Sequence, residues 1–124
     1  MTTSTRVEQL ARSYVETWNQ PDPAVLRAAV GELFSSDVRY VDPLVDVSGR
    51  AALVATITAV RDQFPGFTFR LSGPVDGHHD QTRFGWELGP VDGEAPIAGL
   101  DVAVTDDAGQ IRQVFGFLDR VPAI

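Results

Sequence analysis

The N-terminal half of the chain carries apolar residues at the spacing of a helix. One stripe has members three or four residues apart, at Val7, Leu10, Ala11, Tyr14, Val15 and Trp18. Residues at this spacing share one face of an α-helix. We therefore expect a first helix capped by Thr3 or Ser4, with Tyr14 on its buried face.

A second helix follows a short break. Asn19-Gln20-Pro21 ends the first helix, and Asp22 before Pro23 is typical of a helix start, with a cap residue followed by proline in the first turn. We expect this helix to run to about Phe34. Its buried face would carry Leu26, Ala29, Val30 and Leu33.

Turn residues then delimit a strand, a loop and a third helix. Ser35-Ser36-Asp37 predicts a turn, 38–42 a first strand, and 43–48 a loop with room for a short strand at 45–47. Ser48-Gly49 opens a third helix, which Pro65-Gly66 closes.

Beyond residue 66 the pattern changes from a helical period to alternation. Four segments are typical of strands, over 67–75, 82–88, 97–105 and 110–118. Turn residues separate them at Asp76-Gly77, Gly89-Pro90, Asp92-Gly93 and 106–109. Helices followed by an antiparallel meander indicate an α+β fold, and without linker or repeat we expect residues 1–124 to form one domain.

The strand over 97–105 places a single acid among small residues. Asp101 shares its face with Ile97, Gly99, Ala103 and Thr105, while Leu100, Val102 and Val104 occupy the other face. A buried carboxylate in mid-strand is uncommon without a partner or a function. If the Asp101 face looks toward the helices, the apolar opposite face needs cover, which a homodimer packed through the outer sheet would supply.

Composition narrows the class of protein. The 124 residues are 44% hydrophobic and 22% charged, as in a domain with an ordinary core. A net charge of -7 disfavours nucleic acid and anionic membranes as partners and suits an uncharged ligand. The lack of cysteine excludes a disulfide framework and is compatible with a reducing cytoplasm. No apolar run is long enough to span a membrane, so we expect a soluble, cytoplasmic protein.

A second acid stands at a strand-to-loop corner. Asp42 follows Tyr40-Val41 and precedes Pro43, which cannot continue a ladder and holds the preceding residue extended. Such a corner is a fixed mount for a catalytic carboxylate, although Asp-Pro is also a common turn opener. His78-His79 lies in a turn without further ligands nearby, so no metal site is expected.

Tyr14, Asp42 and Asp101, in this order and context, resemble the ketosteroid isomerases. These enzymes belong to the superfamily that shares the nuclear transport factor 2 (NTF2) fold and includes polyketide cyclases and dehydratases. The resemblance extends over nearly the whole chain, in the motifs Ser13-Tyr14-Val15-Glu16, Val41-Asp42-Pro43, Ser48-Gly49-Arg50 and Leu100-Asp101-Val102. It implies a cone-shaped domain, with a curved antiparallel sheet wrapped around three helices and enclosing an apolar pocket.

The resemblance also implies a role for each residue. Asp42 is the base that removes a proton next to a ketone and returns it at a more distant carbon, while Tyr14 and a protonated Asp101 donate hydrogen bonds to the dienolate oxygen. This division of roles is that of the ketosteroid isomerases themselves. The ligand would be a hydrophobic small molecule, with no cofactor and no metal. We expect Trp18, Phe84, Trp86, Ile97, Val114 and Leu118 to bind it.

Two departures from the resemblance bear on the substrate. Some of these isomerases carry tyrosines that support the Tyr14 equivalent, and this chain has Phe34 and Ile57 at those positions, so no hydroxyl network around Tyr14 is expected. The loop after Pro43 is shorter than in the bacterial steroid enzymes and carries an added acid, Asp46. A ketone other than a steroid is therefore open as the substrate.

Three alternatives accompany the isomerase hypothesis. The chain could be a related cyclase or dehydratase, or a non-catalytic domain that binds a small molecule or associates with a protein, because one fold hosts many functions. Epoxide hydrolysis, known in the same superfamily, requires an arginine that bridges two acids. Arg83 and Arg112 alternate away from the expected pocket face, which ranks this alternative last.

Overall fold

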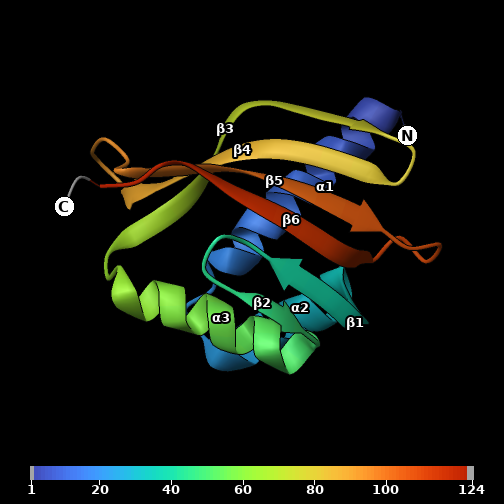
Figure 1. The fold of residues 1–124 in the computed structure, drawn as a ribbon, viewed down its shortest axis with the longest axis horizontal. Helices are drawn as coiled ribbons and strands as arrows, with labels where there is room; N and C mark the ends of the chain where they lie inside the picture. Colours follow the sequence, from blue (N-terminus) through green and yellow to red (C-terminus); the bar gives the residue numbers. More distant parts are fainter. Residues whose placement is uncertain (1, 123–124) are drawn as a thin grey trace.

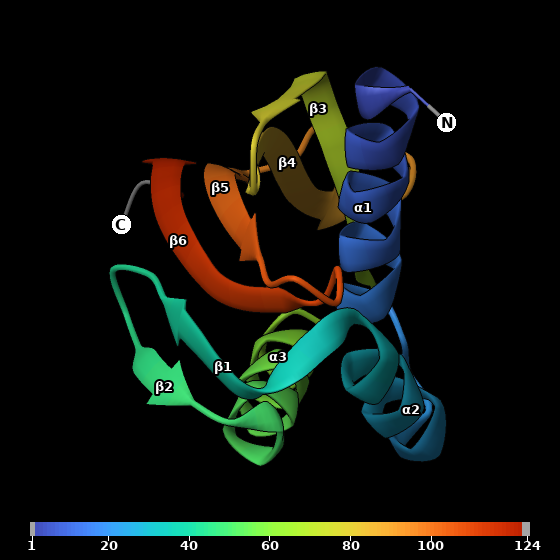
Figure 2. The same cartoon turned by 90° about the vertical axis from the view of Figure 1, so that its right-hand side faces the viewer.

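The computed structural model describes residues 2–122. Three helices precede and interrupt the strands: α1 (Thr3–Trp18), α2 (Pro23–Leu33) and α3 (Arg50–Gln63). The strands are β1 (Phe34–Val41), β2 (Asp46–Ser48), β3 (Phe67–His78), β4 (Gln81–Pro90), β5 (Ile97–Thr105) and β6 (Ile111–Arg120). Figures 1 and 2 show a curved sheet with α1 lying across its inner face and α2 and α3 packed at one end. The α+β fold expected from the sequence is confirmed.

All strands belong to one sheet, in the order β2-β1-β6-β5-β4-β3. Strands β3 to β6 form the expected antiparallel meander. β1 is different, because it pairs in parallel with β6 and antiparallel with the short β2. The long connection through α3 and the meander brings the first and last long strands side by side.

The helix starts follow local capping chemistry. The first cap is Thr2 and not Thr3 or Ser4: its hydroxyl oxygen accepts a hydrogen bond from the Thr5 backbone N–H at 3.1 Å. Asp22 caps α2 as expected, accepting hydrogen bonds from two backbone N–H groups while Pro23 occupies the first turn. Such caps satisfy donors that have no partner inside the helix.

Three expected turns are wrong. β1 begins directly after α2 at Phe34, so Ser35-Ser36-Asp37 lies within a strand. The Phe34 side chain is fully buried and the residue pairs with Ile111 of β6, and this pairing overrides the local turn preference. Asp76-Gly77 also lies in a strand, because β3 continues through a bulge after Ser72 and reaches His78. Gly89-Pro90 forms the end of β4, where the two residues pair with the start of β3.

Glycine permits the corner before α3. Gly49 has a φ of 91°, a conformation that residues with a Cβ rarely adopt. Arg50, the next residue, donates two hydrogen bonds to the Phe34 carbonyl oxygen, at 3.0 and 2.8 Å. The start of α3 is thereby tied to the start of β1. β2, expected at 45–47, forms one residue later.

The two faces of β5 differ as expected. Ile97, Gly99, Asp101 and Ala103 are buried on the inner face, and Leu100 and Val102 are half-buried on the outer face. Val104 departs from this pattern, because it is buried although it belongs to the outer set. The core lies between the inner face and the helices, where its largest fully buried side chains are Phe34, Phe84, Leu53, Ile57 and Ile111. Within residues 2–122, no helix has the length and apolar character that crossing a bilayer requires.

Candidate active site

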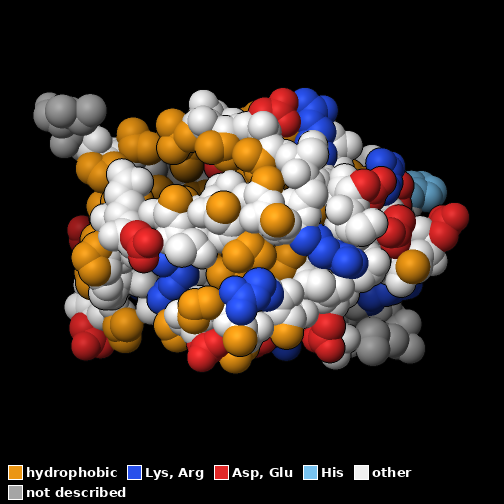
Figure 3. Space-filling model, turned by 90° about the horizontal axis from the view of Figure 1, so that it is seen from below, with side chains coloured by type: hydrophobic (Ala, Val, Ile, Leu, Met, Phe, Trp, Pro, Cys, Tyr) orange, Lys and Arg blue, Asp and Glu red, His pale blue; other side chains and the backbone are white. Residues whose placement is uncertain are grey.

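A cavity of about 210 Å³ opens between the inner face of the sheet and the ends of α1 and α3. Most of its lining is aliphatic or aromatic, and its ionisable side chains are Tyr14, Tyr40, Asp42 and Asp101. Leu44, Phe117 and Val121 line its mouth with exposed apolar surface. Figure 3 shows hydrophobic side chains gathered toward the end of the molecule where β6 ends. The cavity suits an apolar ligand with a few polar atoms.

Asp101 lies at the inner wall of this cavity. β5 carries it on the buried face, and only 3% of its surface is exposed. The Tyr14 hydroxyl donates a hydrogen bond to Asp101 Oδ2 at 2.6 Å, and the Trp86 indole N–H donates one to Oδ1 at 3.0 Å. Burial raises the pKa of Asp101 to about 6, against the lowering effect of these two donors, and the nearby Asp42 charge adds to the rise.

Tyr14 is held by the core around it. Its ring meets Phe84 edge-on at a centroid distance of 4.9 Å and lies 6.0 Å from Phe34. Burial, followed by the charge of Asp101, raises the pKa of the Tyr14 hydroxyl well above its usual value, so the hydroxyl keeps its proton. Its one hydrogen bond among the described residues is to Asp101. No second hydroxyl group donates to Tyr14 or accepts from it within residues 2–122.

Asp42 is half-buried at the end of β1 and accepts three hydrogen bonds. Asp42 Oδ1 accepts from the backbone N–H groups of Leu44 and Val45, at 2.8 and 3.0 Å. Oδ2 accepts from the Tyr40 hydroxyl at 2.7 Å. Because three donors converge on the carboxylate, its orientation is fixed.

Tyr40 is a site residue that the sequence interpretation missed. Its side chain is 5% exposed and lines the cavity. Burial, followed by the charges of Asp101 and Asp42, raises the pKa of its hydroxyl above the usual value. The signal was available: Tyr40 stands two residues before Asp42, and residues at this spacing in a strand point to the same face.

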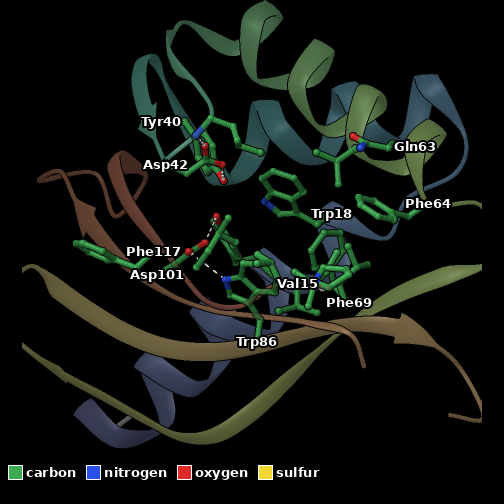
Figure 4. A pocket seen from close by; sticks show the side chains of 18 residues that line it. Val15, Trp18, Tyr40, Asp42, Gln63, Phe64, Phe69, Trp86, Asp101 and Phe117 are labelled. Carbon is green, nitrogen blue, oxygen red and sulfur yellow. Dashed lines mark hydrogen bonds between the residues drawn. The ribbon is translucent and has the colours of Figure 1, made fainter. Parts of the chain in front are cut away.

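Gly116 lies between the two acids. A Cβ at this position would be 3.1 Å from Asp101 Oδ1 and 3.1 Å from Asp42 Cβ. The distance between Asp101 Oδ1 and Asp42 Cβ is therefore at most twice 3.1 Å. Figure 4 shows the two carboxylates facing each other across the cavity. The structure therefore brings together the three residues that the sequence singled out, with Tyr14 reaching this site through Asp101.

The expected ligand-binding residues divide into two groups. Trp18, Trp86, Ile97 and Leu118 line the cavity. Phe84 and Val114 are not among the lining residues and lie in the core. Phe84 supports Tyr14 from behind, and Val114 pairs with Tyr40 across the parallel strands. Further apolar lining comes from Val15, Val60, Phe64, Phe69 and Leu88.

The arginines lie away from both acids. Arg83 pairs with Asp76 at 3.5 Å and Arg112 with Asp80 at 3.9 Å, on the exposed surface. The added loop acid, Asp46, belongs to β2 and forms a two-point ion pair with Arg39, which lowers the pKa of Asp46. The arginine bridge that epoxide hydrolysis requires is not formed by either candidate. Residues 2–122 also contain no group of three or more metal-ligating side chains close enough together to hold an ion.

Residues 11–114 match the SnoaL-like domain family. This match covers most of the chain. The protein belongs to the SnoaL-like family. Comparison with curated proteins finds no significant match.

Solved structures of SnoaL-like proteins share the fold. One, a "putative isomerase of the SnoaL-like family" from Agrobacterium tumefaciens strain C58, is 40% identical over 93% of this chain and 98% of its own, with a TM-score of 0.89. A "putative SnoaL-like polyketide cyclase" from Jannaschia sp. CCS1 is 15% identical over 96% of this chain and 90% of its own, with a TM-score of 0.74. At 15% identity, the similarity to the Jannaschia protein concerns the fold alone. Together they confirm the expected membership in the NTF2-like superfamily.

Proposed function

We propose that this SnoaL-like protein is a cofactor-independent isomerase. It shifts a double bond in a hydrophobic ketone, as steroid Δ-isomerases do, by moving one proton through an enolate. The observation that carries this proposal is the pair of carboxylates facing one apolar cavity: Asp42 has three donors, whereas Asp101 is buried with a pKa raised to about 6. Two acids in opposite environments suit opposite roles in acid–base chemistry.

Asp42 is the base in this proposal. Its Oδ1 is occupied by two backbone N–H groups, and its Oδ2 accepts only the Tyr40 hydroxyl among the described residues. A carboxylate oxygen has two lone-pair positions, so Oδ2 retains one for the substrate proton. The C–H bond next to the ketone breaks, its electron pair moves to the ketone oxygen, and Asp42 gains the proton. Asp42 then returns the proton at the far end of the dienolate, the carbonyl re-forms, and the double bond is conjugated with it.

Asp101 supplies the proton that stabilises the enolate oxygen. With a pKa of about 6, raised first by burial, its carboxyl is partly protonated near neutral pH. Negative charge that develops on a nearby oxygen favours the protonated form further. Tyr14 donates to Asp101 and thus acts through it, which refines the direct contact that the resemblance implied. Donors positioned where charge develops contribute about 3 kcal/mol each in comparable sites.

The relatives support the class of reaction more than the substrate. The Agrobacterium protein, whose name carries the word isomerase, shares 40% of its residues with this chain. The first test is ultraviolet absorbance after mixing the protein with a β,γ-unsaturated 3-ketosteroid, with the Asp42→Asn variant alongside. We expect a conjugated enone to form with the wild type and to be lost in the variant. Equal conversion by both proteins would remove Asp42 from the mechanism.

A cyclase or dehydratase is the second candidate. The hydrogen bonds from Tyr14 and Trp86 stabilise the charged form of Asp101, which favours a second base in the cavity. An enolate formed there could attack another carbonyl of the same molecule and close a ring. Solvent deuterium exchange next to a ketone without double-bond movement would favour this candidate. Ligand binding with neither exchange nor conversion would favour a non-catalytic binding domain.

We also propose that the outer face of the sheet pairs with a second copy of the chain. Phe115 and Phe117 on β6 are 39% and 56% exposed, and they pair with Val102 and Leu100 of β5. Four apolar side chains thus form a continuous outer patch. Sedimentation velocity tests this proposal: we expect a dimer for the wild type and a monomer for Phe115→Asp. A monomeric wild type at micromolar concentration would contradict it.

A further inference from the structure

The cavity contains one buried polar atom that lacks a hydrogen-bond partner among the residues that the structure describes. Trp18 ends α1, is 5% exposed and lines the cavity, yet its indole N–H has no hydrogen-bond partner within residues 2–122. Among the buried side-chain nitrogen and oxygen atoms of residues 2–122, it is the single one without a partner. A buried donor left unpaired destabilises the fold, so its retention at a ligand cavity points to an acceptor that arrives with the ligand.

The other buried donors of the cavity are already engaged. The Tyr14 hydroxyl and the Trp86 indole N–H donate to Asp101, and the Tyr40 hydroxyl donates to Asp42. Gln63 carries an amide, but this side chain is exposed at the rim. A ligand oxygen that enters the cavity can therefore take a hydrogen bond from Trp18 without breaking one that exists.

Packing fixes where this N–H points. The Trp18 ring lies 5.5 Å from the Tyr40 ring and meets Phe69 edge-on at 5.3 Å, so it is held between two walls. Figure 4 shows its nitrogen on the side of the ring that faces the two carboxylates. The N–H also faces the Tyr14 hydroxyl oxygen, and this weak hydrogen-bonding contact lowers the pKa of Tyr14 against the larger effect of burial, but the contact does not have the geometry of a full hydrogen bond. The donor is thus rigid and lies beside the Tyr14–Asp101 pair.

We propose that the Trp18 indole N–H donates a hydrogen bond to the carbonyl oxygen of the ligand, beside Asp101. The ligand has an apolar body and an uncharged oxygen, because a carboxylate or phosphate would be brought from water into an apolar cavity beside the Asp42 carboxylate. That the bound oxygen is the one that becomes the enolate rests on the proposed function. The binding contact itself does not. In this arrangement Trp18 replaces Tyr14 as the second donor to the oxygen, since Tyr14 is committed to Asp101.

The two tryptophans make the test direct. The chain contains only Trp18 and Trp86, so a ¹⁵N-labelled sample gives two indole N–H resonances, which Trp18→Phe and Trp86→Phe assign. The probes are 2-tetralone and tetralin, bicyclic molecules that differ by one carbonyl group. We expect 2-tetralone to move the Trp18 indole proton downfield and tetralin not to do so. A shift confined to Trp86 would overturn the proposal.

Binding constants from the same titrations give a second measure. We expect the wild type to bind 2-tetralone about tenfold more tightly than tetralin, as one well-placed hydrogen bond allows. In Trp18→Phe this preference should fall to about twofold or less, because the aromatic wall remains and the donor is lost. An undiminished preference in Trp18→Phe would refute the inference. Because the chain has only two tryptophans, Trp86→Phe alone assigns both resonances, so the resonance measurement decides the question even if Trp18→Phe does not fold.

Deuterium exchange next to the carbonyl, above the buffer rate, separates this inference from the proposed function. A preference for 2-tetralone that depends on Trp18, without deuterium exchange, would support the binding contact and contradict the proposed isomerase activity. Exchange together with a preference that does not depend on Trp18 would overturn the binding contact and would leave proton removal next to the ketone supported.

Discussion

The raised pKa of Asp101 predicts a pH dependence of stability that Asp101→Asn should remove. Asn has nearly the same shape as Asp and offers an oxygen to the Trp86 N–H, but it has no proton to lose in this range. Burial raises the pKa of Asp101 from 3.8 to about 6 in the folded state. The wild type and the variant therefore differ in one titration, while the remaining acids are common to both.

The sign and size follow from this shift. Below pH 4 the carboxyl is protonated in the folded and the unfolded chain, and its contribution to stability is fully present. Between pH 4 and 6 the unfolded chain loses the proton first, so folding becomes less favourable as the pH rises. A shift of about 2 units at 1.36 kcal/mol per unit amounts to about 3 kcal/mol, lost by about pH 7.

Urea unfolding at pH 4, 5, 6 and 7 measures this difference. We expect the free energy of unfolding of the wild type, relative to Asp101→Asn, to fall by about 3 kcal/mol over this range and to level off above it. Tyr14→Phe serves as a companion variant. It removes a donor that lowers the Asp101 pKa, so the decline should extend to higher pH. A flat difference between wild type and Asp101→Asn would refute the burial argument.

Three substitutions test how the site is built. Tyr40→Phe removes a donor to Asp42 and should lower kcat about tenfold with little change in KM, because the base is less well oriented; an unchanged kcat would contradict this role. Gly116→Ala places a methyl group 3.1 Å from both acids and should lower kcat about a hundredfold while the circular dichroism spectrum stays native; full activity would show that the acids need no such spacing. Gly99→Ala drives a methyl group into the Trp86 ring and to 2.5 Å from the Phe117 carbonyl oxygen, so it should destabilise the fold by about 3 kcal/mol in urea unfolding. An unaltered unfolding midpoint for Gly99→Ala would mean that β5 and its neighbouring strands can move apart to accept the methyl group without loss of stability.

Local patterns predicted most of the elements because local physics decides them. The helical stripe put Tyr14 and Trp18 on the buried face of α1, and strict alternation put Asp101 on the inner face of β5. The turns at Ser35-Ser36-Asp37, Asp76-Gly77 and Gly89-Pro90 were wrong for one shared reason. In each, sheet pairing outweighed the turn preference of a few residues.

The sequence by itself determined which face of its helix or strand most side chains take, since periodicities of 3.6 and 2 assign each residue a face. Only the tertiary structure decided which of them touch. Tyr14 and Asp101 are 87 residues apart in the chain, and their 2.6 Å contact depends on how α1 lies across a curved sheet. The parallel pairing of β1 with β6 brings Asp42 beside Gly116 and so to Asp101. The unpaired N–H of Trp18 was likewise decided by the tertiary structure, because whether a donor finds an acceptor among the described residues depends on which side chains pack around it.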